Sequence, residues 1–127
     1  MRPARILVVE DNPMNMELAV DLLMLQGYEV LSAQTGQEAL AILEREQLDL
    51  VLMDVQLPGM DGLTVTKKLK ENPKTKDIPV VALTAHAMKG DEERMLEHGC
   101  AGYIAKPIDT RAFPKEVEKF INKKMEG

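Results

Sequence analysis

Leu48-Asp49-Leu50-Val51-Leu52-Met53-Asp54 contains an unbroken apolar run, Leu50 to Met53, that ends on the carboxylate of Asp54. An uninterrupted apolar run that ends on one carboxylate is typical of a strand buried on both faces, as in a parallel sheet. A buried helix segment has the same pattern over so few residues, but the turn residues that follow, Pro58-Gly59 and Asp61-Gly62, favour the strand. Asp54 is therefore expected at the carboxyl end of this strand, where open parallel sheets bind their ligands.

Length and composition fit one domain with a single hydrophobic core, because the chain has 127 residues and 45% hydrophobic residues. The net charge of −5 argues against a nucleic-acid or membrane partner. A single cysteine, Cys100, cannot form an internal disulfide and suits a reducing compartment. No signal peptide is visible and no apolar run approaches the roughly 20 residues that span a bilayer. We therefore expect a cytoplasmic protein.

Strand and helix patterns alternate five times along the chain, with short connections. This alternation predicts a single doubly wound α/β domain over residues 1–127, with a parallel sheet, helices on both faces and no output domain. The expected strands are Arg5 to Val9, Glu29 to Ala33, Leu48 to Asp54, Pro79 to Thr84 and Ala101 to Lys106. The expected helices begin at Asn12, Thr35, Asp61, about Ala87, and between Asp109 and Arg111.

The sequence leaves the start of the last helix open and predicts the end and the inner face of the first helix. In the last one, Pro114 would lie inside a helix capped by Asp109 and remove a backbone hydrogen bond, whereas a start near Thr110 or Arg111 would place it earlier in the helix. In the first helix, Gly27 is expected to end the helix. The residues expected on its inner face recur at helical spacing: Leu18, Ala19, Leu22 and Leu25.

Polar residues end four of the five expected strands. In a parallel sheet these ends meet at one edge, so the side chains converge. Crowded carboxylates repel one another unless a cation lies between them, and oxygen ligands without His or Cys suit Mg²⁺. An ammonium and a hydroxyl beside them predict a phosphoryl-transfer site in which one carboxylate accepts the group as an acyl phosphate. The residues concerned are Glu10, Asp11, Asp54, Thr84 and Lys106.

These motifs resemble the receiver domain of two-component response regulators, over essentially the whole chain. The resemblance implies the strand order 2-1-3-4-5 of the CheY/flavodoxin-like fold. Residues 8–15 and 85–94 also resemble the DivK group of stand-alone single-domain receivers. The family motifs are Glu10-Asp11, Asp54 within residues 53–62, Thr84-Ala85 and Lys106-Pro107.

The resemblance implies roles for the residues of the phosphoryl site. Asp54 is the phosphoacceptor, and Thr84 and Lys106 contact the phosphoryl group. The Lys106 ammonium is expected to make its contact only with that group. Tyr103 is the switch aromatic, and the small Ala85 leaves room for its ring to move when Thr84 is drawn inward.

The resemblance also implies the metal ligands. Asp11 binds Mg²⁺ directly, Glu10 acts largely through metal-bound water, and Asp54 and the backbone carbonyl of Gln56 complete the protein's share. Mn²⁺ is an alternative ion. The Lys106-Pro107 bond is expected to be cis, an option that only proline makes cheap.

The function implied is a phosphorylation-activated signalling switch in a phosphorelay. The implied partners are a sensor histidine kinase or a histidine phosphotransfer protein, and a target that binds the phosphorylated form of a monomer. A receiver segment of a larger hybrid kinase is the alternative. A dehalogenase-type phosphatase fits less well, because Gln56 stands where its second aspartate would be, and a flavin binder lacks its phosphate loop after the first strand.

Overall fold

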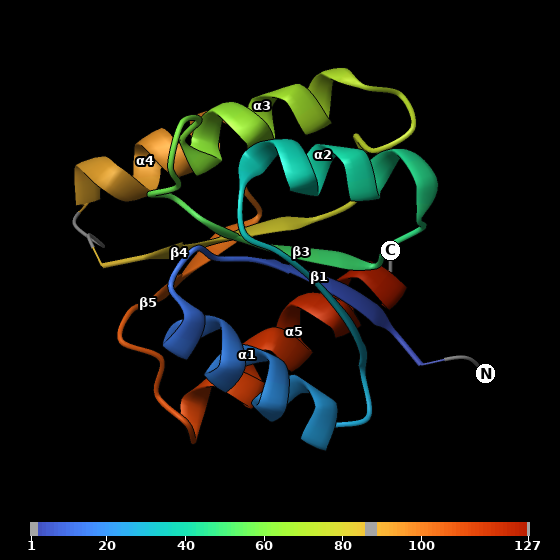
Figure 1. Cartoon of the computed structure of the whole chain (residues 1–127), viewed down its shortest axis with the longest axis vertical. Helices are drawn as coiled ribbons and strands as arrows, with labels where there is room; N and C mark the ends of the chain where they lie inside the picture. The colour runs from blue at the N-terminus through green and yellow to red at the C-terminus, as the bar shows by residue number, and fades with distance from the viewer. Residues whose placement is uncertain (1–2, 86–88, 127) are drawn as a thin grey trace.

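The computed structural model describes residues 3–85 and 89–126. Its five strands form one parallel sheet in the order β2-β1-β3-β4-β5, as expected. Helices α2, α3 and α4 cover one face of the sheet, and α1 and α5 cover the other (Figure 1). The strands are β1 (Arg5–Val9), β2 (Glu29–Ala33), β3 (Leu50–Asp54), β4 (Val80–Thr84) and β5 (Gly102–Ala105). The helices are α1 (Pro13–Leu25), α2 (Gly36–Arg45), α3 (Gly62–Glu71), α4 (Lys89–Glu97) and α5 (Ala112–Glu126).

Strand β3 lies at the centre of the sheet and is buried along its whole length. Val51 and Met53 belong to the core under α2 and α3, whereas Leu50 and Leu52 belong to the core under α1 and α5. Both faces of the strand are therefore apolar, which explains the unbroken run in the sequence. The strand starts two residues later than predicted, at Leu50.

Helix α1 has the expected ends, and its inner face includes Ala19 and Leu22 as predicted but not Leu25. Asn12 caps it by accepting hydrogen bonds from the backbone N–H groups of Met14 and Asn15 at 3.0 Å, and Gly27 follows its last turn with φ +88°. Leu25, predicted to face inward, is 80% exposed, and Leu23 is buried instead. The prediction was wrong here because apolar residues occur on nearly every side of this helix, so their spacing does not select one face.

Helix α5 begins at Ala112, later than either start that the sequence offered. Asp109 Oδ1 accepts hydrogen bonds from the N–H groups of Arg111 and Ala112 at 2.8 and 3.1 Å. Pro114 is consequently in the first turn, where a backbone N–H has no partner within the helix and proline costs little.

Helix α4 is held to the sheet by few apolar contacts. Met95 is its one buried side chain among the described residues. The predicted start of this helix, near Ala87, lies outside the described residues. No helix in the described part of the chain has the length and apolar character needed to cross a membrane.

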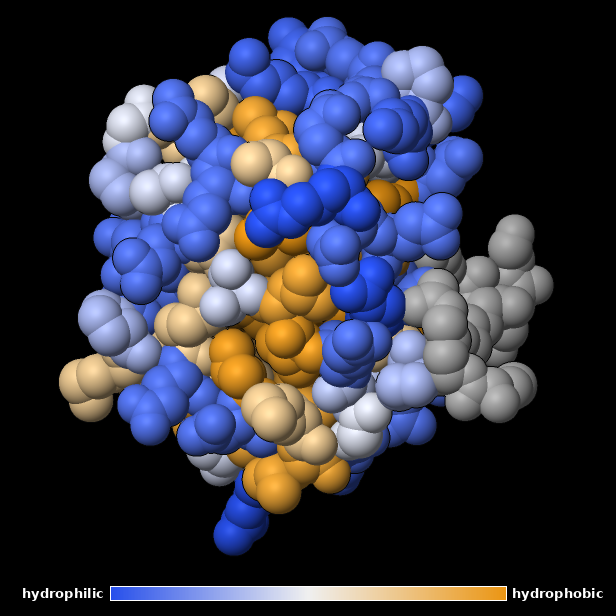
Figure 2. Space-filling view, turned by 45° about the vertical axis from the view of Figure 1, so that its right-hand side comes forward, coloured by the Kyte–Doolittle hydropathy of each residue, from blue (hydrophilic) through white to orange (hydrophobic). Residues whose placement is uncertain are grey.

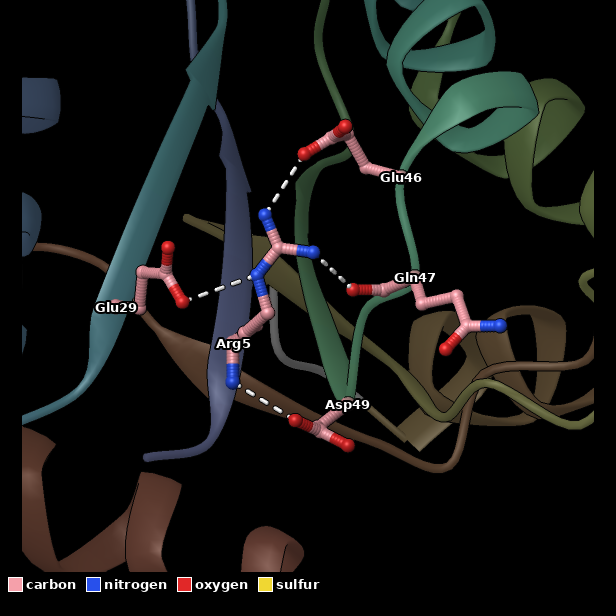
Figure 3. A network of polar contacts seen from close by, with 5 residues as sticks. All are labelled: Arg5, Glu29, Glu46, Gln47 and Asp49. Carbon is pink, nitrogen blue, oxygen red and sulfur yellow. Dashed lines mark hydrogen bonds and ion pairs between the residues drawn. The ribbon is translucent and has the colours of Figure 1, made fainter. Parts of the chain in front are cut away.

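An ion-pair network joins the amino-terminal ends of β1 and β2 to the segment that leads into β3 (Figure 3). Asp54 lies at the other end of β3. The Arg5 guanidinium lies 3.1 Å from Glu29 and 2.8 Å from Glu46, and it donates a 2.8 Å hydrogen bond to the Gln47 carbonyl. The Arg5 backbone N–H donates to Asp49 at 2.8 Å. One arginine thus connects β1, β2 and the segment that leads into β3.

Candidate functional site

Three carboxylates meet at the carboxyl edge of the sheet. Glu10 and Asp11 follow β1, and Asp54 ends β3, its neighbour in the sheet. One side-chain oxygen from each lies within 4.8 Å of the others. Glu10 and Asp54 are almost completely buried, at 1% and 3% exposure, whereas Asp11 is exposed. The structure therefore brings together the acidic residues that the sequence predicted, in a position open to solvent through Asp11.

Lys106, which follows β5, reaches this group from the other side. Its Nζ lies 2.8 Å from Glu10 Oε1 and 3.1 Å from Asp54 Oδ2. The expectation that the ammonium contacts only a phosphoryl group is wrong for this state of the protein. Two buried carboxylates attract the lysine before any phosphoryl group is present, so Lys106 supplies part of the countercharge that we assigned to a metal.

Burial and mutual contact shift the pKa values of this group. Burial, and next the close contact with the Glu10 carboxylate, raise the pKa of Asp54 to about 7. Burial also acts to raise the pKa of Glu10, but contacts with Asp54 and Lys106 outweigh it and hold that pKa below its usual range. The two carboxylates raise the pKa of Lys106 despite its burial. Asp54, rather than Glu10, is therefore the carboxyl group that is protonated in part of the molecules near neutral pH.

The donor set fits a hard divalent cation. Neither side-chain oxygen of Glu10 accepts a well-directed hydrogen bond from the described residues, although Lys106 lies close to one of them as an ion pair. A buried carboxylate with unused acceptor positions is suited to a metal or to metal-bound water, and the cluster offers oxygen atoms throughout. Glu10, Asp11 and Asp54 would hold the ion.

Gln56 contacts the site through its backbone. Its N–H donates a 3.0 Å hydrogen bond to Asp54 Oδ1, which fixes the direction of that carboxylate. The expected metal contact of the Gln56 carbonyl stays a prediction. The cis peptide bond between Lys106 and Pro107 is confirmed.

The expected switch residues lie on paired strands beside the carboxylates. Thr84 ends β4 and is 5% exposed, and Ala85 after it is exposed. Tyr103 pairs with Ala82 on β4. Thr84 lies two residues after Ala82, so the side chains of Thr84 and Tyr103 are on the same face of the sheet, the face that carries α4. Tyr103 is half-buried. The structure places these residues near one another, and their role in a switch stays a prediction.

A cavity of about 490 Å³ adjoins Thr84 and Gln56. Its remaining wall includes Asp91, Arg94 and Met95 from α4. Sequence reasoning did not assign these α4 residues to the site, although Asp91 and Arg94 belong to the stretch that resembles DivK, because their place beside Thr84 depends on how the chain folds.

Fold and site together define a doubly wound α/β protein with a cluster of three carboxylates, and a lysine beside it, at the carboxyl ends of the strands. The sequence model of the response regulator receiver domain family matches residues 6–118 of the chain. The chain belongs to this family.

Sequence similarity to individual proteins supports the same family. The chain is 45% identical over 119 residues to the polar-differentiation response regulator DivK of Brucella anthropi, covering 94% of this chain and 97% of that protein. It is 46% identical over 116 residues to DivK of Brucella ovis, covering 91% of this chain and 94% of the relative. The resemblance to DivK is therefore confirmed.

Solved structures agree on the fold. The receiver domain of the sensor histidine kinase PA1611 from Pseudomonas aeruginosa superposes with a TM-score of 0.86 at 34% identity, covering 94% of this chain and 98% of that one. That structure has a magnesium ion coordinated in the active-site cleft. A CheY-like receiver domain protein from Methanospirillum hungatei superposes with a TM-score of 0.89 at 27% identity, covering 98% of both chains.

Proposed function

We propose that this chain is a phosphorylation-controlled switch and that Asp54 is its phosphoacceptor. The observation that carries the proposal is the position of the Asp54 carboxylate. It is buried, lies 3.1 Å from the Lys106 ammonium, and shares an acidic cluster with Glu10 and Asp11. The family supports this role, because receiver domains of two-component systems act with histidine kinases.

The transfer step forms one bond and breaks one bond. An Asp54 carboxylate oxygen forms a bond to phosphorus, and the P–N bond of a phosphohistidine donor breaks. The imidazole leaves with the electron pair and takes up a proton. The Lys106 ammonium can follow the negative charge from the carboxylate to the phosphoryl oxygens, and the Gln56 N–H holds Asp54 in place.

Magnesium, when bound, supplies positive charge that offsets the charge of the phosphoryl oxygens. Its proposed ligands are Asp11 directly, Glu10 largely through water, Asp54, and the Gln56 carbonyl. The oxygen-only donor set and the magnesium ion in the PA1611 receiver support this assignment. Mn²⁺ has the same ligand preference and is expected to substitute.

The signal is proposed to leave through Thr84. Its hydroxyl donates to a phosphoryl oxygen, and the loop that begins at Ala85 shifts. The Tyr103 ring then moves inward, on the face that carries α4. Helix α4 suits such a role because Met95 is its one buried side chain among the described residues, so displacing it breaks few contacts.

The proposed partners are a histidine kinase or a histidine phosphotransfer protein, and a protein target in the cytoplasm that distinguishes the two states of α4 and β5. A receiver segment of a hybrid kinase is the second candidate, supported by the likeness to the receiver of a sensor kinase. The length of the endogenous protein on an immunoblot of its source cells separates the two candidates.

Incubation with Mg²⁺ and acetyl phosphate tests the proposal. Intact-mass spectrometry should show one added phosphoryl group per chain in the wild type and none in Asp54→Asn. Asp21→Asn is the matched control, because Asp21 is exposed on α1, outside the acidic cluster, and its loss should not change labelling. Equal labelling of Asp54→Asn and the wild type would refute the assignment.

A further inference from the structure

Strand β2 is an outermost strand of the sheet and, among the described residues, pairs only with β1. The pairing with β1 shows which of its backbone groups point away from the sheet. The Glu29 N–H donates to Ala4, and the Ala33 carbonyl accepts from Glu10, so the odd-numbered residues of β2 bond to β1. The alternation of a strand then directs the N–H and C=O groups of Val30 and Ser32 away from the sheet. These four groups form a short template for another strand.

The edge lacks the side chains that usually protect such a strand. Exposed edges commonly carry lysine or proline, and residues 29–33 contain neither. The one charged residue is Glu29, and its carboxylate is drawn toward β1 by Arg5 at 3.1 Å, as Figure 3 shows. The Glu29 carboxylate therefore does not block the unpaired side of β2.

Apolar side chains flank the edge on both faces of the sheet. Val30 and Leu22 pack on the α1 side, Leu31 and Leu40 pack on the α2 side, and all four are only partly buried. The strand joining α1 to α2 runs between these helices at the front of the molecule (Figure 1). With the right-hand side of that view turned forward, the surface shows apolar residues gathered in a band with polar residues around it (Figure 2).

We propose that β2 is an interface for a second copy of this chain, which adds its own β2 antiparallel and joins the two sheets. With the two-fold axis at Leu31, Val30 of each copy lies opposite Ser32 of the other. Each such pair exchanges two N–H to C=O hydrogen bonds, so the interface has four.

The side chains support a second copy as the occupant rather than an unrelated peptide. The same axis places Leu31 opposite Leu31 at the closely spaced, non-hydrogen-bonded position, where apolar contact is strongest. Glu29 lies opposite Ala33, so no like charges face each other across the new ladder. Self-complementarity in both hydrogen bonds and charge is what a two-fold interface requires. The net charge of −5 on each copy opposes association, so salt should strengthen the dimer.

Sedimentation equilibrium at high salt tests the inference, with Ser32→Pro and Ser32→Ala as a matched pair. Proline removes the outward N–H of residue 32 without removing a hydrogen bond to β1, and it is tolerated on edge strands. The wild type and Ser32→Ala should dimerise with the same Kd, and Ser32→Pro should weaken dimerisation roughly tenfold or more, because two of the four hydrogen bonds are lost.

A wild type that stays monomeric over its whole soluble range, as expected from the sequence, would overturn the proposal, and so would an unchanged Kd in Ser32→Pro. If Ser32→Pro does not fold, hydrogen exchange of the wild type decides. The amides of Val30 and Ser32 should become protected as protein concentration rises, and exchange independent of concentration would contradict the interface. None of these measurements depends on phosphorylation at Asp54.

Discussion

Asp54 shows how a single buried carboxylate links stability to pH. Its pKa is about 7 in the folded protein, against 3.8 for an ordinary aspartate, because burial and Glu10 disfavour its charged form. The folded state therefore binds more protons than the unfolded state between these values, and stability falls as pH rises through that window. Glu10 acts in the opposite direction, but only below its ordinary pKa of 4.5.

Asp54→Asn should remove this pH dependence. In metal-free buffer the variant should gain unfolding free energy relative to the wild type, on the order of 2 kcal/mol at about pH 8 and less at about pH 5. Urea denaturation at both pH values measures the difference, with Asp21→Asn as the control. A difference that does not grow with pH would show that Asp54 is already ionised.

Lys106 is paired with both buried carboxylates before phosphorylation, so its removal should affect the resting protein. Lys106→Met leaves two carboxylates without their cation and should cost about 2 kcal/mol of unfolding free energy in metal-free buffer at neutral pH. Mg²⁺ affinity should not fall, since the ammonium competes with the metal for these oxygens. Denaturation and metal titration measure the two effects, and the exposed Lys119→Met is the control. Reduced Mg²⁺ affinity in Lys106→Met would contradict this competition.

At the scale of elements, the start of α3 is packed directly on the end of β3. A Cβ atom at Gly62 would lie 2.0 Å from the Asp54 carbonyl oxygen, which is backbone and cannot give way easily. A Cβ atom at Gly90, in α4, would have no atom from another described part of the chain within 4 Å. The chemistry of Asp54 therefore depends on a glycine eight positions later, where the helix approaches the strand.

Gly62→Ala and Gly90→Ala form a matched pair. The first should lose several kcal/mol of unfolding free energy, on the order of 3, because backbone must shift to accept the methyl group. The second should be neutral or gain up to about 1 kcal/mol from better helix propensity. Thermal and urea denaturation compare them. Equal stabilities of the two variants would mean that the contact at Gly62 is not tight.

The proposed route from Asp54 to α4 makes a prediction for elements that lie apart from the phosphoryl group. With beryllofluoride as a phosphoryl mimic, NMR shifts in the wild type should extend from Asp54 to Tyr103 and α4. In Thr84→Ala the mimic should still bind, but the shifts should stay near Asp54, because the hydroxyl that joins the two regions is gone. Thr84→Ser keeps the hydroxyl and should behave as the wild type does. The same spread of shifts in Thr84→Ala would refute the route.

At the scale of the whole molecule, the sequence predicted the alternation, the sheet and the residues that converge at its edge. The alternation of side chains along the strands already predicts which side of the sheet three of the site residues share. Val8, Leu52 and Ile104 share the core under α1 and α5, and two residues further along each segment stand Glu10, Asp54 and Lys106. Extending a period of two therefore places these three on the same side of the sheet.

Other features could not be predicted because they arise from packing between distant segments. Nothing local in Lys106 shows that it contacts Glu10, which is far away in the chain. Leu25 and Leu23 differ only in which side of an apolar helix meets the sheet. Asp91 and Arg94 belong to the stretch that resembles DivK, but nothing local in the sequence places them in a cavity wall beside Thr84.

Chemical identification of the phosphorylated residue is the strongest test of Asp54 as the phosphoacceptor. After phosphorylation with acetyl phosphate and Mg²⁺, borohydride reduces an aspartyl phosphate to homoserine, which peptide mass spectrometry can locate. We expect homoserine at position 54 and at no other position that holds an aspartate in the sequence. Homoserine at another position, or a phosphoryl group that borohydride does not remove, would contradict the assignment of Asp54 as phosphoacceptor.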